Sequence, residues 1–338
     1  MQVEGIVLRG RSFTPVEGRV VVEDGQIVSI EEEPVEGESI ILPTFVNAHT
    51  HVGDSIAKDA GTGLTLEELV APPDGLKHRL LRTASRDRLV GGMRRSLRYM
   101  AATGTTTFVD FREGGIEGVT ALEEAANAIE IDPVILGRDD PTVLEVADGY
   151  GASGAADGEF GQERSLAAEA GKLFGIHAGE NDAADINAAL DLDPDFLVHL
   201  VAAESVHLER IADARTPVVV CPRCNRATGV GTPPIEALVE RTTVALGTDN
   251  VMLASPNMFR EMAFVEAITD LEPATILGMA TWAGAELAGI DGGVIEAGEP
   301  GRMLVLDGGS DNLVGTQDVR RTVVRRAGPT DVDQIISG

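Results

Sequence analysis

The residues best suited to chemistry are four of the six histidines and one aspartate, each at or just after the end of a short apolar run. His49 and His51 are two positions apart, His177 and His199 follow in later runs, and Asp249 comes after the last one. Imidazole nitrogens with a carboxylate oxygen form a ligand set that suits Zn²⁺ or Fe²⁺ and leaves an open position for water. Because a bound ion lowers the pKa of water toward about 7, the pattern predicts a hydrolase.

The spacing of the first two histidines has a geometric meaning. Side chains two positions apart on a strand point to the same side, so the imidazoles of His49 and His51 are expected to face the same space. Two buried imidazoles side by side are costly unless each is hydrogen-bonded or bound to a metal. The pair therefore favours a metal site inside the fold.

Eight short apolar runs that alternate with helical segments can position these residues. This order is typical of a parallel sheet with crossover helices, and eight such units predict an α/β fold, the (β/α)8 TIM barrel, with its active site at the carboxyl ends of the strands. The expected strands are 45–49, 106–111, 134–137, 145–148, 173–177, 196–200, 217–221 and 244–247, and 148–161 is expected to be a loop. The expected helices are 86–103, 120–130, 164–169, 183–190 and 234–241.

Strands are also expected near both ends of the chain. The expected ranges are 18–25, 26–30, 301–307 and 321–325. Alternating apolar residues and an Asp-Gly turn between the first two carry this prediction. We therefore expect a small flanking β domain of sandwich type, built from 1–42 and 294–338, beside a barrel that spans 43–293.

Several motifs occur in a fixed order along the chain. They are Asn47-Ala-His-Thr-His51, His177-Ala-Gly-Glu180, His199, Cys221-Pro-Arg-Cys-Asn225 and Leu246-Gly-Thr-Asp249. Together they resemble the amidohydrolase superfamily, and most of all its aminohydrolase branch of cytosine, guanine, adenosine, methylthioadenosine and S-adenosylhomocysteine deaminases. The resemblance runs in register from about residue 42 to residue 307 and includes the return segment 293–307.

The resemblance implies hydrolytic deamination of a heterocyclic amidine, meaning a nucleobase, a nucleoside-like ring or a pterin-like ring. It implies that Glu180 is the proton shuttle, that His199 orients the water or polarises the substrate, and that Asp249 also accepts a proton. No lysine ends an expected strand, so a single ion is expected rather than a pair bridged by a modified lysine. The ligands of that one ion, Zn²⁺ or Fe²⁺, would be His49, His51, His177 and Asp249.

Two residues in these motifs differ from the residues usual in the family, and their positions bear on which substrate is bound. Cys224 stands where the family usually has serine, and Val220 stands where it often has histidine. The segment 66–79 after the first barrel strand is short, and in the family this region commonly closes over the substrate. Lys77, His78 and Asn225 are therefore expected to contact the substrate.

Other interpretations of these residues stay open at this point. Glu180 could be a carboxylate at a helix N-terminus, Asp249 a helix cap and Asn225 a turn residue. Cys221 and Cys224 form a C-x-x-C pair that could be a redox site, although such pairs normally open a helix and this one ends an expected strand.

Three classes of function compete for the whole chain. A deaminase is the first. The same site could instead hydrolyse a cyclic or linear amide C–N bond or a ring C–Cl bond, and the release of ammonia distinguishes these reactions. A barrel that binds a metal or ligand without catalysis is the third class, and a carboxylate at Glu180 argues against it because a pure binder needs no proton shuttle.

Composition limits the location and the partners. Among 338 residues, 27 are Lys or Arg and 55 are Asp or Glu, so the formal charge is −28, which argues against a nucleic-acid partner. No apolar run is long enough for a membrane span and no signal peptide is visible, so a cytoplasmic protein is expected. Only three basic residues are lysines, a bias typical of proteins from halophilic archaea. The resemblance also implies a homodimer.

Overall fold

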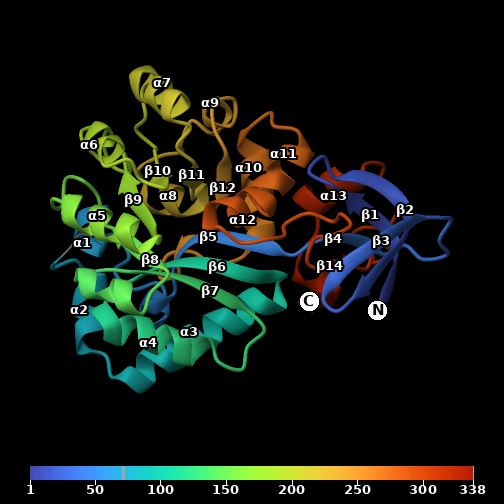
Figure 1. Ribbon diagram of the computed structural model, residues 1–338, viewed down its shortest axis with the longest axis horizontal. Coiled ribbons are helices and arrows are strands. Elements are labelled where there is room, and N and C mark those ends of the chain that lie inside the picture. The colour runs from blue at the N-terminus through green and yellow to red at the C-terminus, as the bar shows by residue number, and fades with distance from the viewer. Residues whose placement is uncertain (71–72, 338) are drawn as a thin grey trace.

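The protein is built from two sheets, as a computed structural model shows for residues 1–70 and 73–337. The larger sheet is parallel and has nine strands, with helices packed around its outside (Figure 1). The smaller sheet has six strands and is made from both ends of the chain, which lie close together at one end of the molecule (Figure 1).

The larger sheet curls until its two edges meet. Its order is β12-β11-β10-β9-β8-β7-β6-β5-β13, and β12 and β13 are separated by only two residues. β12 pairs with β11 while β13 pairs with β5, so the last segment of the sheet returns to the first and gives a TIM-like barrel. The strands are β5 Phe45–His51, β6 Thr105–Arg112, β7 Asp132–Gly137, β8 Gly149–Ala152, β9 Leu173–Ala178, β10 Phe196–His199, β11 Val218–Val220, β12 Val244–Leu246 and β13 Asp249–Asn250.

The helices cover the barrel with apolar faces. In the longest, Val90, Met93, Leu97 and Met100 recur every three or four residues and are buried, and Ser85 caps its N-terminus. None of the helices in the described ranges combines the length and the apolar character needed to cross a membrane. The helices around the barrel are α1 Leu66–Val70, α2 Leu76–Thr83, α3 Arg86–Ala102, α4 Gly115–Ala126, α5 Gly161–Ala170, α6 Ile186–Asp191, α7 Ser205–Ala214, α8 Pro222–Thr228, α9 Ile235–Val239, α10 Met258–Ile268, α11 Pro273–Met279 and α12 Trp282–Ala288, with 3₁₀ turns η1 Val52–Ala57 and η2 Pro141–Glu145.

The six-stranded sheet joins the two chain ends through β4 and β14. Its order is β15-β14-β4-β1-β2-β3, and all pairs are antiparallel except β1 with β4. Val7, Val20, Ile41 and Met303 form part of its apolar core. The strands are β1 Gln2–Arg9, β2 Thr14–Glu23, β3 Gln26–Glu32, β4 Ile40–Pro43, β14 Arg302–Leu306 and β15 Val332–Ser337, with 3₁₀ turn η3 Pro329–Asp331 before the last.

The expected strand at 321–325 is wrong, because this segment is the helix α13 Val319–Arg325. Its β-branched run favours a strand locally, but Asp318 caps the helix by accepting hydrogen bonds from the N–H groups of Arg320 and Arg321. Val323 and Val324 are fully buried against the barrel helices, so tertiary packing outweighs the local preference. The strand at this end of the chain is β15.

The fourth barrel strand is also displaced from its expected position. The segment 145–148 carries no strand, and β8 lies within the segment 148–161 that was expected to be a loop. The glycines that suggested a loop are needed for packing: a Cβ on Gly151 would lie 2.6 Å from Cγ of Phe111, and one on Gly149 would lie 2.3 Å from the carbonyl oxygen of Leu173. A strand crowded on both faces therefore looks like a loop in the sequence.

Candidate metal centre and active site

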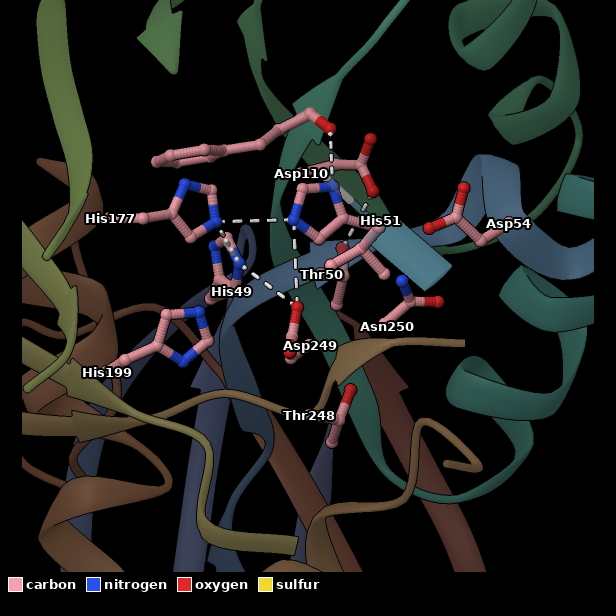
Figure 2. Close-up of polar contacts among 12 residues, drawn as sticks. His49, Thr50, His51, Asp54, Asp110, His177, His199, Thr248, Asp249 and Asn250 are labelled. Atoms are coloured by element: carbon pink, nitrogen blue, oxygen red, sulfur yellow. Dashed lines mark hydrogen bonds and ion pairs between the residues drawn. The ribbon is translucent and has the colours of Figure 1, made fainter. Parts of the chain in front are cut away.

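The expected histidines and aspartate converge at the carboxyl ends of the barrel strands (Figure 2). His49 and His51 come from β5, His177 from β9, His199 from the end of β10 and Asp249 from β13. The structure thus brings together side chains that are up to 200 positions apart in the sequence. Because both histidines of β5 lie on the same side of the strand, their rings meet the other side chains in one place.

The ligand-type atoms of His49, His51, His177 and Asp249 lie close together in four pairs. Nε2 of His177 is 3.3 Å from Nε2 of His49 and 3.4 Å from Nε2 of His51. Oδ1 of Asp249 is 3.4 Å from Nε2 of His49 and 3.6 Å from Nε2 of His51. These contacts bring three nitrogen donors and one oxygen donor together. His49 is common to two groups of possible ligands, one with His51 and Asp249 and one with His177 and His199.

Hydrogen bonds at Nδ1 of His177 and His51 determine whether Nε2 of each ring carries a proton or a lone pair. Nδ1 of His177 lies 2.9 Å from the carbonyl oxygen of Ala152, and Nδ1 of His51 lies 3.1 Å from that of Phe111. A carbonyl only accepts, so each Nδ1 carries the proton and each Nε2 carries a lone pair. Two lone pairs that face each other cannot hydrogen-bond, but both can bind a cation. The residues therefore fit a divalent metal ion.

The ionisation states also suit a metal centre. Burial lowers the pKa of His49 and His177, and it lowers the pKa of His51 to about 3, so these rings are neutral near pH 7. Burial alone would raise the pKa of Asp249, but its hydrogen bond with His49 and the neighbouring imidazoles bring that pKa well below its usual value. Neutral imidazoles beside a carboxylate are the forms that bind a metal.

A second group of polar residues lies beside the first. Oε2 of Glu180 is 3.6 Å from Nε2 of His199, and these two residues and Asp249 offer ligand-type atoms within 4.8 Å of one another. Asn225 contacts both Glu180 and His199. Burial raises the pKa of Glu180, which makes this carboxyl better able to hold and release a proton near neutral pH.

A cavity of about 720 Å³ opens onto both groups of residues. Residues of α1 and α2 line one side of it, which matches the expectation for segment 66–79, of which 71–72 lie outside the described residues. Lys77 and His78, the residues of this segment expected to contact the substrate, both line the cavity. Asn225 is fully buried, and its neighbours Cys224 and Thr228 line the cavity in its place.

Lys77 is not a free cation at the cavity wall. Its ammonium lies 2.7 Å from Oε1 of Glu113 and 3.1 Å from Oδ2 of Asp54, and its side chain is almost fully buried. Glu113 also contacts Arg138 at 3.2 Å and Nδ1 of His51 at 3.1 Å. Sequence reasoning missed Glu113, although it follows β6 directly and so stands at a strand end where site residues gather.

The two cysteines form no redox pair in this setting. Cys221 is the N-cap residue of α8 and Cys224 lies in its first turn, so the motif does open a helix, contrary to the expectation. Both thiols are free and buried, and burial raises the pKa of each well above its usual value. Redox cysteines need accessible thiols of lowered pKa, so this pair packs the barrel instead.

The chain is also similar in sequence to a known family of enzymes. Residues 40–337 match the amidohydrolase family model. The chain is 36% identical to a protein of Methanothermobacter thermautotrophicus named "Putative aminohydrolase", over 90% of each chain. It is 28% identical to the 5-methylthioadenosine/S-adenosylhomocysteine deaminase of Halobacterium salinarum, over 94% of this chain and 86% of the other.

A solved structure supports the fold alone. The zinc complex of the atrazine chlorohydrolase TrzN from Arthrobacter aurescens superposes with a TM-score of 0.85, at 18% identity, over 99% of this chain and 93% of the other. The family match spans most of the chain, and the ligand atoms converge where the barrel strands end. The chain therefore belongs to the amidohydrolase family.

Proposed function

We propose that this protein is a metal-dependent aminohydrolase that hydrolytically deaminates a heterocyclic amidine. The observation that carries the proposal is the juxtaposition of the converging ligands, His49, His51, His177 and Asp249, with a half-buried carboxyl at Glu180. A relative that is 28% identical over most of the chain bears the name of a methylthioadenosine/S-adenosylhomocysteine deaminase. A nucleobase, nucleoside-like or pterin-like ring is the substrate class we infer.

One divalent ion would be held by the three imidazoles and Asp249, and zinc or iron(II) would suit these donors. When bound, the ion supplies a Lewis acid that makes a nucleophile available from water at neutral pH. None of the three lysines of the chain lies in a barrel strand, which favours a single ion over a pair bridged by a modified lysine. The resemblance to a zinc-bound barrel supports zinc as the first ion to test.

The residues of this chain move the protons. Glu180 takes a proton from the attacking water and gives it to the ring nitrogen, and later to the departing amine. Its raised pKa suits both steps, because the group must accept and then release the proton. His199 donates a hydrogen bond to the substrate or water, and Asp249 accepts a proton in addition to binding the ion. Lys77 and His78 shape one wall of the cavity.

The rest of the proposal concerns the whole molecule. Residues 1–42 with 294–338 form a small β domain of sandwich type, and 43–293 form the (β/α)8 barrel. The protein acts in the cytoplasm, without nucleic-acid or membrane partners, and pairs as a homodimer. The net charge of −28 supports the absence of a nucleic-acid partner, because phosphate binding needs clustered cations.

The test is a screen for ammonia release in high salt. Zinc-loaded and iron-loaded protein would be incubated with a panel of aminopurines, aminopyrimidines, adenosine thioethers and aminopterins, with metal content measured on the same sample. We expect ammonia from at least one compound, lost on chelation and restored by metal. Products with an intact amine, such as those of amide or C–Cl cleavage, would contradict deamination and assign another hydrolytic reaction to the protein. Inactivity of fully metal-loaded protein would favour a binding role.

A matched variant pair tests the proton shuttle. E180Q keeps the shape of the side chain but cannot carry the proton, so turnover should fall by about 10²–10⁴-fold with metal content unchanged. The control is E209Q, an exposed residue of α7 far from the cavity, which should leave turnover unchanged. Ammonia release by E180Q at the wild-type rate would remove Glu180 from the mechanism.

A further inference from the structure

Asn225 lies on α8, contacts both proposed proton-transfer residues and is fully buried. Its Nδ2 is 3.3 Å from Oε1 of Glu180 and 3.1 Å from Nδ1 of His199. Among the residues that the structure describes, Oδ1 of Asn225 has no hydrogen-bond partner. The NH₂ group thus donates one hydrogen bond to each of two residues of the site. The side-chain oxygen is unpaired among the described residues.

The orientation of this amide follows from the chemistry of its neighbours. Glu180 must be ionised before it can take a proton from water, and an ionised carboxylate only accepts hydrogen bonds. In this resting state the NH₂ group and not the oxygen of Asn225 faces Glu180. The reverse orientation would place Oδ1 against the oxygen of Glu180. The same NH₂ group then has its second proton directed at Nδ1 of His199.

That second contact determines the tautomer of His199. Because Nδ1 accepts a hydrogen bond from Asn225, it carries the lone pair, and the proton of the neutral ring is on Nε2. Nε2 is the atom that faces Oε2 of Glu180, at 3.6 Å. The proton of His199 therefore points toward the reacting centre, where it can be donated.

We propose that Asn225 is a positioning residue that holds His199 in its Nε2–H tautomer and aligns Glu180 beside it. This role replaces the expected direct contact between Asn225 and the substrate. The catalytic consequence rests on the proposed function, but the tautomer itself does not. In the parts of the chain that the structure describes, no other hydrogen bond reaches Nδ1 of His199, so loss of Asn225 leaves the two tautomers free to exchange.

The discriminating variant is N225D. An aspartate of the same shape accepts but does not donate, so it would draw the proton of His199 to Nδ1 and repel Glu180. We expect kcat to fall by about 10- to 100-fold with KM and zinc content little changed, since no metal ligand is altered. N127D makes the same chemical change at an exposed position after α4 and should leave kcat unchanged.

Nitrogen-15 NMR of the histidine rings reads the tautomer directly. Zinc-loaded protein labelled at histidine would be measured at pH 8, above the usual imidazole pKa of about 6.5. The His199 signal is identified among six histidines by its loss in H199Q. We expect Nε2–H in the wild type and Nδ1–H in N225D.

The wild-type spectrum decides the proposal even if N225D fails to fold or no substrate is found. A wild-type His199 that carries its proton on Nδ1 overturns it, as does an N225D protein that keeps the Nε2–H tautomer. A wild-type Nε2–H signal together with an inactive, zinc-loaded enzyme would support the role of Asn225 while counting against the proposed deamination.

Discussion

The side chain of Asn47 and the backbone and side chain of Thr248 form a reciprocal pair across the seam of the barrel. Nδ2 of Asn47 donates to Oγ1 of Thr248 at 2.8 Å, and Oδ1 of Asn47 accepts the N–H of Thr248 at 3.0 Å. Asn47 precedes His49 by two positions on β5, and Thr248 directly precedes Asp249. This pair therefore sets the register between the strand that carries two histidines and the segment that carries the aspartate.

We expect N47A to loosen this register. The substitution leaves the buried hydroxyl of Thr248 without its partner, whereas the N–H of Thr248 keeps its hydrogen bond to the carbonyl oxygen of His49 at 3.1 Å. The unpaired hydroxyl should lower the free energy of unfolding by about 1–3 kcal/mol. Zinc affinity should fall as well, because Asp249 is then held beside His49 by backbone contacts alone. Urea denaturation and competition with a chromophoric chelator measure the two effects. The exposed variant N127A should change neither, and an unaltered zinc affinity in N47A would show that the seam does not position the ligands.

Glu113 should control metal affinity through His51. Its Oε1 is 3.1 Å from Nδ1 of His51 and also contacts Lys77 and Arg138. E113Q weakens the orientation of the ring and leaves Lys77 less compensated, so we expect zinc affinity to fall about 10- to 100-fold. Stability should fall by about 3 kcal/mol, as for a broken buried ion pair.

The control for Glu113 is E117Q on the exposed side of α4. Both variants would be titrated with zinc in the same high-salt buffer and unfolded with urea. Equal zinc affinity in E113Q and E117Q would mean that the carbonyl oxygen of Phe111 alone orients His51.

Glu261 predicts a pH dependence of stability. It is fully buried on α10 and contacts Arg223, and burial raises its pKa to about 7. Because its pKa in the unfolded chain is near 4.3, the protonated form favours the folded state. The stabilisation is complete below about pH 4.3 and is lost as pH rises through about 7.

Comparison with E261Q isolates this contribution. The free energy of unfolding of the wild type should fall by about 3 kcal/mol more than that of E261Q between pH 4 and pH 8, at constant high salt. Urea titrations at several pH values measure the difference. Parallel curves for the two proteins would show that Glu261 stays ionised beside Arg223.

Zinc should stabilise the folded state through His177. A ligand that binds only the folded protein adds about 4 kcal/mol at a free concentration 1,000 times its Kd. Scanning calorimetry should therefore show a higher Tm with zinc and a lower one after chelation, and H177A should lose this shift. His207 supplies the control, since its ring accepts a hydrogen bond from the N–H of Glu204 at the start of α7 and does not line the cavity. H207A should unfold at a lower temperature yet keep its response to zinc.

The sequence by itself determined which donor side chains gather at the candidate centre. The two-residue spacing of His49 and His51 requires that both point to one side of a strand, and the runs before His177 and Asp249 end where barrel strands end. These are local features, so they could be predicted without knowing which strands pair. The helix at 86–102 was predictable for the same reason, because its apolar period and its cap are written in consecutive residues.

Only the tertiary structure decided the contacts around that centre. Asn225 contacts His199, and Glu113 contacts His51 and Lys77. These contacts join segments that lie far apart in the sequence, and no local pattern specifies them. The same holds for β8, where glycine is required by neighbouring strands, and for α13, where burial overrides a β-branched run. Local periodicity determines where a strand or helix can start and end. Long-range packing determines which side chains contact one another, and therefore which nitrogen of a buried histidine carries its proton.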